Sequence, residues 1–120
     1  DYGYLDKKMK NTLQAVSKHK YCDVLKSFRN SDITYNLNFN LINRIVKKFG
    51  PCSSLFTTQK KFLTKLGILD RAEILSKNMS FREKANIYFR IKRLIDTNQM
   101  GNLFKVMFIT DIKNKFKLGF

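Results

Sequence analysis

Hydrophobic residues recur at helical spacing in two long stretches of the chain. In the first, over Phe39–Phe49, they form one continuous apolar face, and Gly50–Pro51 follows directly. Asn38 or Asn40 can cap the start of such a helix, and glycine followed by proline is typical of a helix end. We therefore predict a helix over 39–49.

The second stretch begins at Ser80–Glu83, where a serine precedes a glutamate by three positions. This spacing is that of a capping box, in which the two residues satisfy each other's backbone N–H groups. The pattern predicts the longest helix of the chain, from there to about Ile95. Its periodicity predicts one buried stripe: Phe81, Ala85, Tyr88, Ile91 and Ile95.

Two shorter helices are expected between these long ones. Thr57 or Thr58 caps the first, which Gly67 ends. A second capping-box spacing at Asp70–Glu73 opens the other helix. In that helix we expect Ile74 and Leu75 to face inward.

Four segments have the character of extended chain: Thr12–Val16, Asp32–Leu37, Ser53–Thr57 and Phe104–Thr110. The last of them is apolar on both faces, as is typical of a strand inside a sheet. The rest of the first thirty residues is predicted to be irregular, and Asn98–Gly101 to be a turn. Strands mixed with helices and no linker between them predict one continuous α/β unit.

The chain is strongly basic, with 24 Lys and Arg against 9 Asp and Glu and a net charge of +15. Such a charge is typical of proteins that bind polyanions. Lysines outnumber arginines three to one, however, whereas phosphate and base recognition favours arginine. Because Lys, Asn, Phe, Ile and Tyr share AT-rich codons, we attribute most of the charge to genomic composition.

Composition excludes several kinds of site. The five glycines are too far apart for a glycine-rich phosphate loop, so no complete cofactor-binding motif is present. Cys22 and Cys52 form neither a C-x-x-C pair nor a disulfide framework, and reduced thiols are expected. A single histidine, His19, gives no basis for a metal site.

Two local patterns suggest chemistry of their own. His19 and Asp23 could pair as a base and the group that orients it, but no nucleophile lies beside them in the sequence. Lys18–Tyr21 and Lys113–Phe116 interleave basic and aromatic residues, which suits single-stranded nucleic acid. A small basic nucleic-acid-binding module is therefore the alternative function.

An ordered series of short motifs carries a family resemblance. The motifs are Asp1–Tyr4, Asn11–Val16, His19–Leu25, Asp32–Thr34 with Phe39, Thr58–Gln59, Phe62–Leu63, Leu66–Ile68, Arg71–Ala72, Lys92–Ile95 and Asn98–Val106. Together they resemble the C-terminal part of the MidA-type S-adenosylmethionine-dependent methyltransferases. That family includes a mitochondrial arginine methyltransferase that assists assembly of respiratory complex I.

The resemblance implies the C-terminal half of a class I, Rossmann-like methyltransferase fold, with an incomplete sheet and covering helices. Residues 1–110 would be this portion and residues 111–120 a basic tail. Asp1–Tyr4 would end the fifth strand of the fold, Ser53–Thr57 would be the sixth strand, and Phe104–Thr110 the seventh and antiparallel one. The S-adenosylmethionine loop would lie upstream, so we expect no cofactor binding and no activity from this chain alone.

The resemblance also suggests a set of pocket residues, although it identifies no catalytic residue. The candidates are Asp1, Tyr2, Gly3, His19, Tyr21, Asp32, Thr34 and Gln59. The chain departs from the family at Lys60, where a glycine is usual, and at Asn38, where an aspartate is usual. Both departures put activity in doubt and fit a split or decaying gene.

Partners and location follow from the same resemblance. The expected partner is the missing N-terminal half or a complementary fragment, and the methyl acceptor of the full-length family is a protein arginine. We expect no membrane association, because no apolar run reaches the length of a span. The bacterial cytoplasm is the expected compartment, with the mitochondrial matrix as the alternative. The unpaired edge left by the missing strands predicts that the isolated chain aggregates or is loosely packed.

Overall fold

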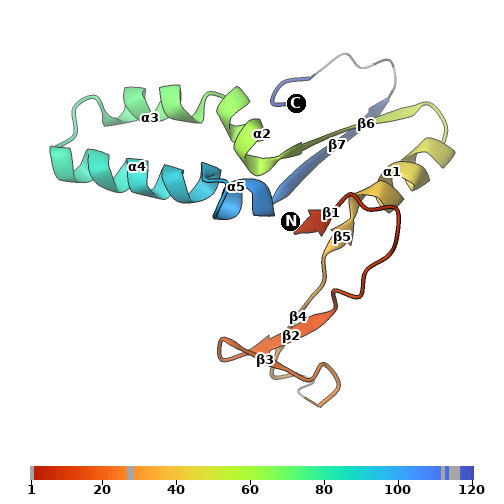
Figure 1. Ribbon diagram of the computed structural model, residues 1–120. Helices are drawn as coiled ribbons and strands as arrows, with labels where there is room; N and C mark the ends of the chain where they lie inside the picture. The colour runs from red at the N-terminus through yellow and green to blue at the C-terminus, as the bar shows by residue number, and fades with distance from the viewer. Residues whose placement is uncertain (1, 27–28, 112, 114–116) are drawn as a thin grey trace.

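The computed structural model describes residues 2–26, 29–111, 113 and 117–120 of the chain. The strands are β1 (Gly3–Tyr4), β2 (Gln14–Ser17), β3 (Lys20–Cys22), β4 (Asp32–Thr34), β5 (Leu37–Asn38), β6 (Cys52–Thr58) and β7 (Lys105–Asp111). The helices are α1 (Phe39–Lys48), α2 (Gln59–Lys65), α3 (Ile68–Ser76), α4 (Phe81–Ile95) and α5 (Met100–Leu103). The predicted α/β class is confirmed (Figure 1).

The described strands form three small sheets. β1 and β5 pair in parallel, β2 lies between β3 and β4 in an antiparallel sheet, and β6 pairs antiparallel with β7. A single antiparallel bridge between Tyr2 and Phe104 connects the start of β1 to the start of β7. The order β5–β1–β7–β6 is therefore nearly continuous across the body of the molecule.

The β6–β7 pair is the centre of the body, and different elements cover its two faces. On one face Phe56 packs against Phe39 of α1, with ring centroids 5.0 Å apart. Neighbouring residues of a strand point to opposite faces, so Leu55 and its partner Phe108 face the other way. There Phe120 packs against Phe108 at 5.8 Å and against Phe62 of α2 at 5.3 Å.

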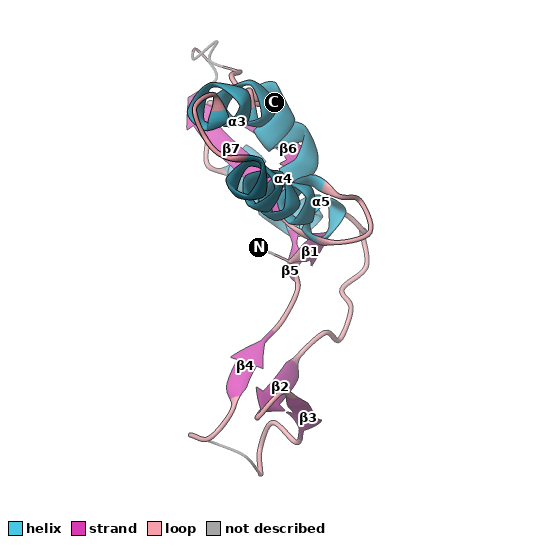
Figure 2. Cartoon of the chain, turned by 90° about the vertical axis from the view of Figure 1, so that its left-hand side faces the viewer, coloured by secondary structure: helices cyan, strands magenta, loops and turns pink. Residues whose placement is uncertain are grey.

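Two parts of the chain project from this body. α3 and α4 form a helical hairpin that extends to one side, and α5 returns the chain to β7 (Figure 1). The three-stranded sheet of β2, β3 and β4 forms an arm that points away from the helices (Figure 2). The β2–β3 turn is built on Lys18 and His19, both with positive φ, as two-residue hairpin turns require.

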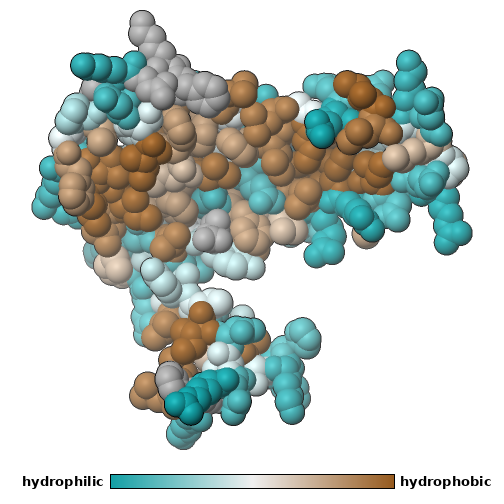
Figure 3. Space-filling view, turned by 180° about the vertical axis from the view of Figure 1, so that it is seen from behind, coloured by the Kyte–Doolittle hydropathy of each residue, from teal (hydrophilic) through white to brown (hydrophobic). Residues whose placement is uncertain are grey.

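These projections leave the chain extended. Its radius of gyration is 18.5 Å, whereas a compact domain of this length has about 14 Å. Its accessible surface is 9831 Å², whereas a compact monomer of this mass exposes about 6,800 Å². Few apolar residues of the described part are fully covered: Ala15, Phe39, Val46, Ala72 and Ile91. Apolar side chains accordingly gather on the outside of the body and along the hairpin (Figure 3).

Helix caps agree closely with the sequence predictions at three helices. Asn38 caps α1 by accepting the N–H of Leu41, and Thr58 caps α2 by accepting the N–H of Lys61. Ser80 and Glu83 form the predicted capping box at the start of α4. The strand predictions for the β6 and β7 segments are also confirmed, as is their antiparallel pairing.

The helix predicted after Gly67 is present as α3, but the predictions for its capping box and its buried face are wrong. Its N-cap is Gly67, in the left-handed conformation, so Asp70 lies inside the first turn and opens no capping box. The buried residues of α3 are Ala72 and Ser76, while Ile74 and Leu75 are exposed. Because α3 packs mainly on α4 at the edge of the molecule, its small residues meet the neighbour and its large ones face outward.

The predicted stripe of α4 is also largely wrong. Ile91 is buried and Ile95 is half-buried, but Ala85 and Tyr88 are exposed and Phe81 is 89% exposed. In α1 Val46 is buried, whereas Leu41, Ile45 and Phe49 are exposed. Periodicity identified the helices, but it treats every apolar face as buried, whereas several apolar faces of these helices are not covered by the described part of the chain.

Three smaller differences concern the connections. The strand predicted at Thr12–Val16 corresponds to β2, whereas β3 forms in a segment that was predicted to be irregular. The turn predicted at Asn98–Gly101 leads into the short helix α5. Within the expected tail, β7 extends to Asp111 and Phe120 packs on the body. No helix of the described residues has the length and apolar character needed to cross a membrane.

Candidate functional site

The arm brings three predicted pocket residues onto one face of its sheet. Val16 lies directly opposite Tyr21 on one side and Asp32 on the other, and Gln14 lies opposite Thr34. Directly opposite residues share a face, and so do residues two apart, so Tyr21, Asp32 and Thr34 all lie on the same side. Thr34 Oγ1 accepts a hydrogen bond from Gln14 Nε2 at 3.1 Å.

This arm face is open to solvent. Tyr21 is 79% exposed, and Asp32 and Thr34 are exposed as well. A phenol ring, a carboxylate and a hydroxyl in this setting can bind a cationic or hydrogen-bonding group presented by another molecule. An exposed face cannot exclude water, so it lacks one requirement of a catalytic pocket.

His19 lies at the tip of the arm rather than beside an orienting carboxylate. Its backbone has a φ of 63°, which the hairpin turn requires, and its side chain is exposed. Asp23 Oδ1 accepts the backbone N–H groups of Leu25 at 2.8 Å and Lys26 at 3.3 Å. That carboxylate therefore serves a local turn, and the described contacts support a structural role for it.

A hollow lies where the arm joins the body. Tyr2 lines it together with residues 33–35 and Leu37, and its volume is about 430 Å³. The Tyr2 ring packs on Phe104 at 4.7 Å, and the Tyr2 carbonyl accepts the N–H of Leu37 at 3.0 Å. Of the predicted pocket residues, the hollow thus brings together Tyr2 and Thr34.

The other predicted residues near the N-terminus have different positions. Asp1 lies outside the described residues. Gly3 lies in β1 against Phe39, and a Cβ added to it would stand 2.2 Å from a ring carbon of Phe39 and 2.6 Å from the Leu37 carbonyl oxygen. This close approach explains why a glycine is needed there without any role in chemistry.

The carboxyl ends of β1 and β5 carry polar residues that the sequence prediction did not include. Ligands of open α/β sheets bind outside such strand ends. Here the Tyr4 hydroxyl accepts the backbone N–H of Lys10 at 2.9 Å, and the Lys10 ammonium lies 5.2 Å from the centre of the Tyr4 ring. Lys10 also pairs with Asp6, which raises the pKa of the lysine through a hydrogen bond and charge attraction.

Asn38 completes this strand end and explains one of the family departures. It is buried, caps α1 through its side-chain oxygen, and donates from Nδ2 to the sulfur of Met9 at 3.5 Å. An aspartate could cap the helix equally well but could not donate to that sulfur. The asparagine therefore suits the packing of this chain.

Gln59, the last predicted residue, is structural in this arrangement. Its Nε2 donates to the carbonyl of Leu94 at 2.9 Å and thereby ties α2 to the end of α4. The next residue, Lys60, is exposed on α2, where lysine favours the helix more than glycine does. The second family departure is thus compatible with the fold.

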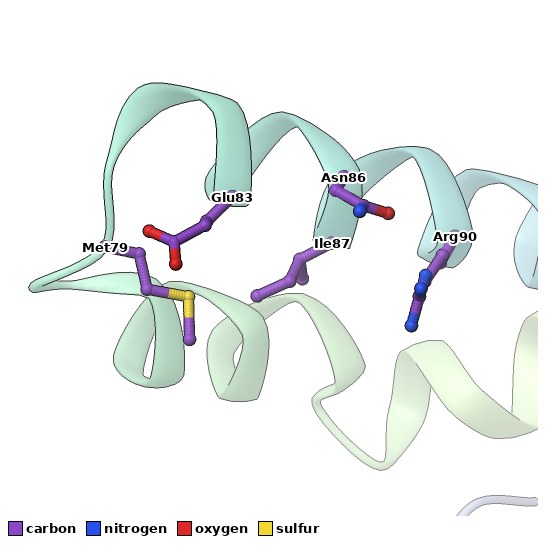
Figure 4. Close-up of a pocket in the computed structure, with 5 residues that line it drawn as sticks. All are labelled: Met79, Glu83, Asn86, Ile87 and Arg90. Atoms are coloured by element: carbon purple, nitrogen blue, oxygen red, sulfur yellow. The ribbon is translucent and has the colours of Figure 1, made fainter.

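A separate hollow lies on the helical hairpin and is drawn in Figure 4. Its lining residues are Met79, Glu83, Asn86, Ile87 and Arg90. The Glu83 carboxylate accepts the Ser80 hydroxyl at 2.7 Å and the Ser80 N–H at 2.9 Å, which lower its pKa. Because these bonds serve the helix cap, the Glu83 carboxylate is engaged, and Asn86 and Arg90 supply the other polar groups of the hollow.

Comparison with known proteins places this geometry in context. Residues 1–57 match the family described as "Putative S-adenosyl-L-methionine-dependent methyltransferase". The mitochondrial protein arginine methyltransferase NDUFAF7 of Xenopus tropicalis is 30% identical over 106 residues, which are 88% of this chain and 24% of that protein. Its counterpart in Xenopus laevis is 28% identical over 98% of this chain and 27% of that protein. The chain thus spans about a quarter of the length of these relatives.

Two crystal structures of proteins from Burkholderia thailandensis share the fold. One aligns with a TM-score of 0.76 and 26% identity over 99% of this chain and 33% of the other. The second, bound to S-adenosyl-homocysteine, aligns with a TM-score of 0.73 and 26% identity over 99% of this chain and 32% of the other. The resemblance predicted from the sequence motifs is therefore confirmed: residues 1–57 match an S-adenosyl-L-methionine-dependent methyltransferase family, and the chain is similar in sequence to two mitochondrial arginine methyltransferases and in fold to the two bacterial structures.

Proposed function

We propose that this chain is the C-terminal part of an S-adenosylmethionine-dependent methyltransferase and acts only together with a cofactor-binding part. The observation that carries the proposal is its extended shape combined with partial coverage of its relatives. The chain aligns over nearly its whole length with only about a quarter of the two arginine methyltransferases. It also exposes far more surface than a compact domain of its size.

The missing part would supply the glycine-rich loop and the parallel strands that bind S-adenosylmethionine. One of the solved structures is bound to S-adenosyl-homocysteine, and this chain aligns with about a third of it. None of the five glycines here lies in a phosphate-loop pattern. We therefore expect no cofactor binding by the chain alone.

For the methyl acceptor we propose a protein arginine, since both relatives are named as protein arginine methyltransferases. A guanidinium group binds carboxylates through paired hydrogen bonds and stacks on aromatic rings. Asp32 and Tyr21 offer these two groups on one face of the arm. The arm would thus hold the substrate protein, while the reaction would take place at the sheet.

Calorimetry with S-adenosylmethionine tests this function. The chain is titrated alone and after mixing with the remaining polypeptide of the Xenopus tropicalis relative, that is, the part outside the matched quarter. We expect only the mixture to bind S-adenosylmethionine and to transfer its methyl group to an arginine side chain of a substrate protein. Tight binding by the chain alone would refute the proposal, as would a stable mixture that binds no cofactor.

The nucleic-acid alternative is tested in the same preparation. Lys18, Lys20 and Tyr21 are exposed at the tip of the arm, where they could contact a phosphate backbone. If the chain binds RNA through this surface, its affinity for RNA should fall steeply as the salt concentration rises. Lys18→Glu and Lys20→Glu should each reduce that affinity. The second basic–aromatic stretch, Lys113–Phe116, lies mostly outside the described residues.

The compartment remains a prediction. The crystal structures come from a bacterium, in line with the expected cytoplasmic location, whereas both arginine methyltransferases are named as mitochondrial. We favour the mitochondrial matrix, because the identity to the Xenopus tropicalis protein is slightly higher than to either bacterial structure. Imaging the tagged protein in its own cells decides between the two.

A further inference from the structure

The exposed side of α1 carries three large apolar side chains in one row. Leu41, Ile45 and Phe49 are four positions apart, and residues at this spacing lie one above the other on a helix. They are 39%, 44% and 78% exposed, whereas Phe39 and Val46 of the same helix are buried. The helix thus has an exposed apolar stripe, made of Leu41, Ile45 and Phe49. It lies at the opposite end of the body from the helical hairpin (Figure 1).

Basic side chains run directly beside this apolar stripe. Arg44 and Lys48 are also four positions apart, and each precedes a residue of the stripe by one position. Lys47 lies in the same last turn of α1, and all three side chains are exposed. Among the described residues, none of the three has an acidic side chain within ion-pair distance. We call these three residues the basic row.

The sequence around α1 contains no acidic residue. Between Asp32 and Asp70 there are six Lys and Arg and neither Asp nor Glu. The sheet brings one carboxylate toward this region, since Asp111 lies opposite Cys52 and accepts the backbone N–H of Lys113 at 2.9 Å. The charge around the apolar stripe is therefore mainly positive, and it complements an anionic surface.

The apolar stripe and the basic row together favour a membrane over a protein or a nucleic acid. Lysine is depleted at protein–protein interfaces, and a row of apolar side chains contributes nothing to binding a phosphate backbone. A helix that lies in the plane of a membrane uses both kinds of residue. Its apolar side chains enter the lipid, and the Lys and Arg beside them reach the headgroups. The expectation of no membrane association rested on spanning length, which such a helix does not need.

We propose that α1 docks on the surface of an anionic phospholipid membrane, with the apolar stripe among the acyl chains and the basic row at the headgroups. Phe49 enters deepest, because it is the most exposed of the three and is followed by the exposed corner of Gly50 and Pro51. The helix has ten residues, so the docking is reversible. This inference goes beyond the proposed function and does not depend on it.

Flotation with lipid vesicles tests the proposal, because bound chain rises with the vesicles whereas aggregated chain sinks. One set of vesicles contains phosphatidylglycerol and phosphatidylcholine, and the other contains phosphatidylcholine alone. We expect binding to the anionic vesicles that weakens as the salt concentration rises, and little binding to the neutral ones. The remaining polypeptide of the Xenopus tropicalis relative, added to the same samples, should leave this binding unchanged.

One pair of variants tests the apolar stripe. Phe49→Ala should weaken binding to the anionic vesicles about tenfold, since the side chain that enters the lipid is lost. The fold is kept, because the helix end depends on the backbone N–H of Phe49, which donates to the Val46 carbonyl at 3.1 Å. Phe81→Ala is the matched control. Phe81 is 89% exposed on α4, close in sequence to the acidic Glu83, and its replacement should leave binding unchanged.

A second pair of variants tests the basic row. Replacing Lys47 and Lys48 together by glutamine should weaken binding to the anionic vesicles about tenfold or more. Replacing Lys60 and Lys61 together by glutamine removes the same charge from α2, at the other end of β6, where both lysines are exposed. We expect the second change to weaken binding much less than the first.

Several results would overturn the proposal. Equal binding to the two sets of vesicles would do so, as would equal binding by Phe49→Ala and Phe81→Ala. Loss of vesicle binding on addition of the remaining polypeptide would show that a protein surface covers the apolar stripe instead. RNA binding that requires Lys47 and Lys48 but not Phe49, in a chain that does not float with vesicles, would assign the basic row to nucleic acid. Vesicle binding by a chain that supports no methyl transfer would uphold this inference and refute the proposed function.

Discussion

At the scale of single residues, Gly3 shows how tightly one part of this loose molecule is packed. Its backbone passes so close to Phe39 and to the Leu37 carbonyl that no side chain fits between them. The sequence motif containing Gly3 suggested a ligand pocket, whereas the structure gives the glycine a packing role. Its function is to let β1 approach α1 and β5.

Replacing this glycine should detach β1. In Gly3→Ala the new methyl group must displace Phe39 or the β5 backbone, and overpacking of this kind costs about 1–3 kcal/mol. The N–H of Leu37, which donates to the Tyr2 carbonyl, should then exchange faster with solvent. Leu5→Ala is the control, because it trims a side chain next to β1 that is 53% exposed. Unchanged exchange at Leu37 in Gly3→Ala would contradict this account.

The capping box of α4 predicts a pH dependence. Hydrogen bonds from Ser80, first from its hydroxyl and then from its N–H, lower the pKa of Glu83. A lowered pKa in the folded state means that the cap is fully formed above the ordinary carboxyl pKa. The cap is lost as the pH falls through the lowered value.

An NMR titration of the Glu83 carboxyl carbon measures this pKa. Ser80→Ala should raise it toward the ordinary range, since the hydroxyl makes the larger contribution. In Glu83→Gln the Ser80 amide resonance should no longer shift between pH 5 and about 3, while the capping geometry is kept. A Glu83 pKa that does not respond to Ser80→Ala would show that the box does not hold the carboxylate in solution.

Helix caps were predictable because they depend on residues a few positions apart. Asn38, Thr58 and Ser80 all act as the sequence indicated. The pocket residues were not predictable in the same way, since Tyr2 and Thr34 meet only through pairing of distant segments. The sequence prediction did not include Tyr4 and Lys10 among the polar residues at the strand end. The only indication was weak: Tyr4 ends a motif that was assigned to a strand, and Lys10 lies in the basic segment that follows it.

At the scale of elements, the α3–α4 hairpin exposes apolar residues that periodicity placed inside. Phe81, Tyr88 and Ile74 are 89%, 42% and 74% exposed. The sequence correctly predicted that these segments are helical, because helical spacing is a local property. It could not predict which face is covered, because the covering surface is not supplied by the described residues of this chain.

Residues 117–120 form a turn, closed by the N–H of Phe120 donating to the carbonyl of Lys117 at 3.0 Å, and the packing of this turn on the body was not predicted. Gly119 is buried with a φ of +85°, and a Cβ there would stand 2.6 Å from a ring carbon of Phe62. Gly119→Ala should therefore release Phe120 from Phe62 and Phe108. An alanine in the left-handed backbone conformation costs about 1–2 kcal/mol. This cost should raise the fraction of molecules in which Phe120 is detached roughly tenfold.

Carboxypeptidase digestion measures this release. We expect Phe120 to be removed several times faster from Gly119→Ala than from the unchanged chain. Leu118→Ala is the matched control, since Leu118 is 58% exposed. Equal digestion rates for the two variants would show that the packing of Phe120 does not protect the C-terminus.

At the scale of the whole molecule, shape is the property that distinguishes this chain from an ordinary small domain. In solution at low concentration we expect a radius of gyration near 18.5 Å and strong binding of a hydrophobic dye to its exposed apolar surface. Measuring the radius of gyration over a series of protein concentrations distinguishes an extended monomer from a self-associated one. A value near 14 Å, as for a compact domain of this length, would contradict the extended arrangement.

The mixture of strands and helices predicted one continuous α/β unit, but it did not indicate that this unit is extended. The motifs led to the family correctly, because they preserve local turns and strand ends. They could not show that β2, β3 and β4 form a projecting arm or that the hairpin extends away from the body. Both features depend on which segments distant in the sequence contact one another, and short motifs do not contain that information.

The Tyr2–Phe104 bridge has a consequence for the order of folding. Nearly the whole chain lies between its two residues, so a large loop must close before the bridge can form. During synthesis, Tyr2 emerges long before Phe104 and has no partner in β7 until Phe104 has been made. Any preceding strand must remain unpaired on that side for the same period. Among the described strands β7 is made last, so β1 and β6 are brought into one sheet only after both have been synthesised.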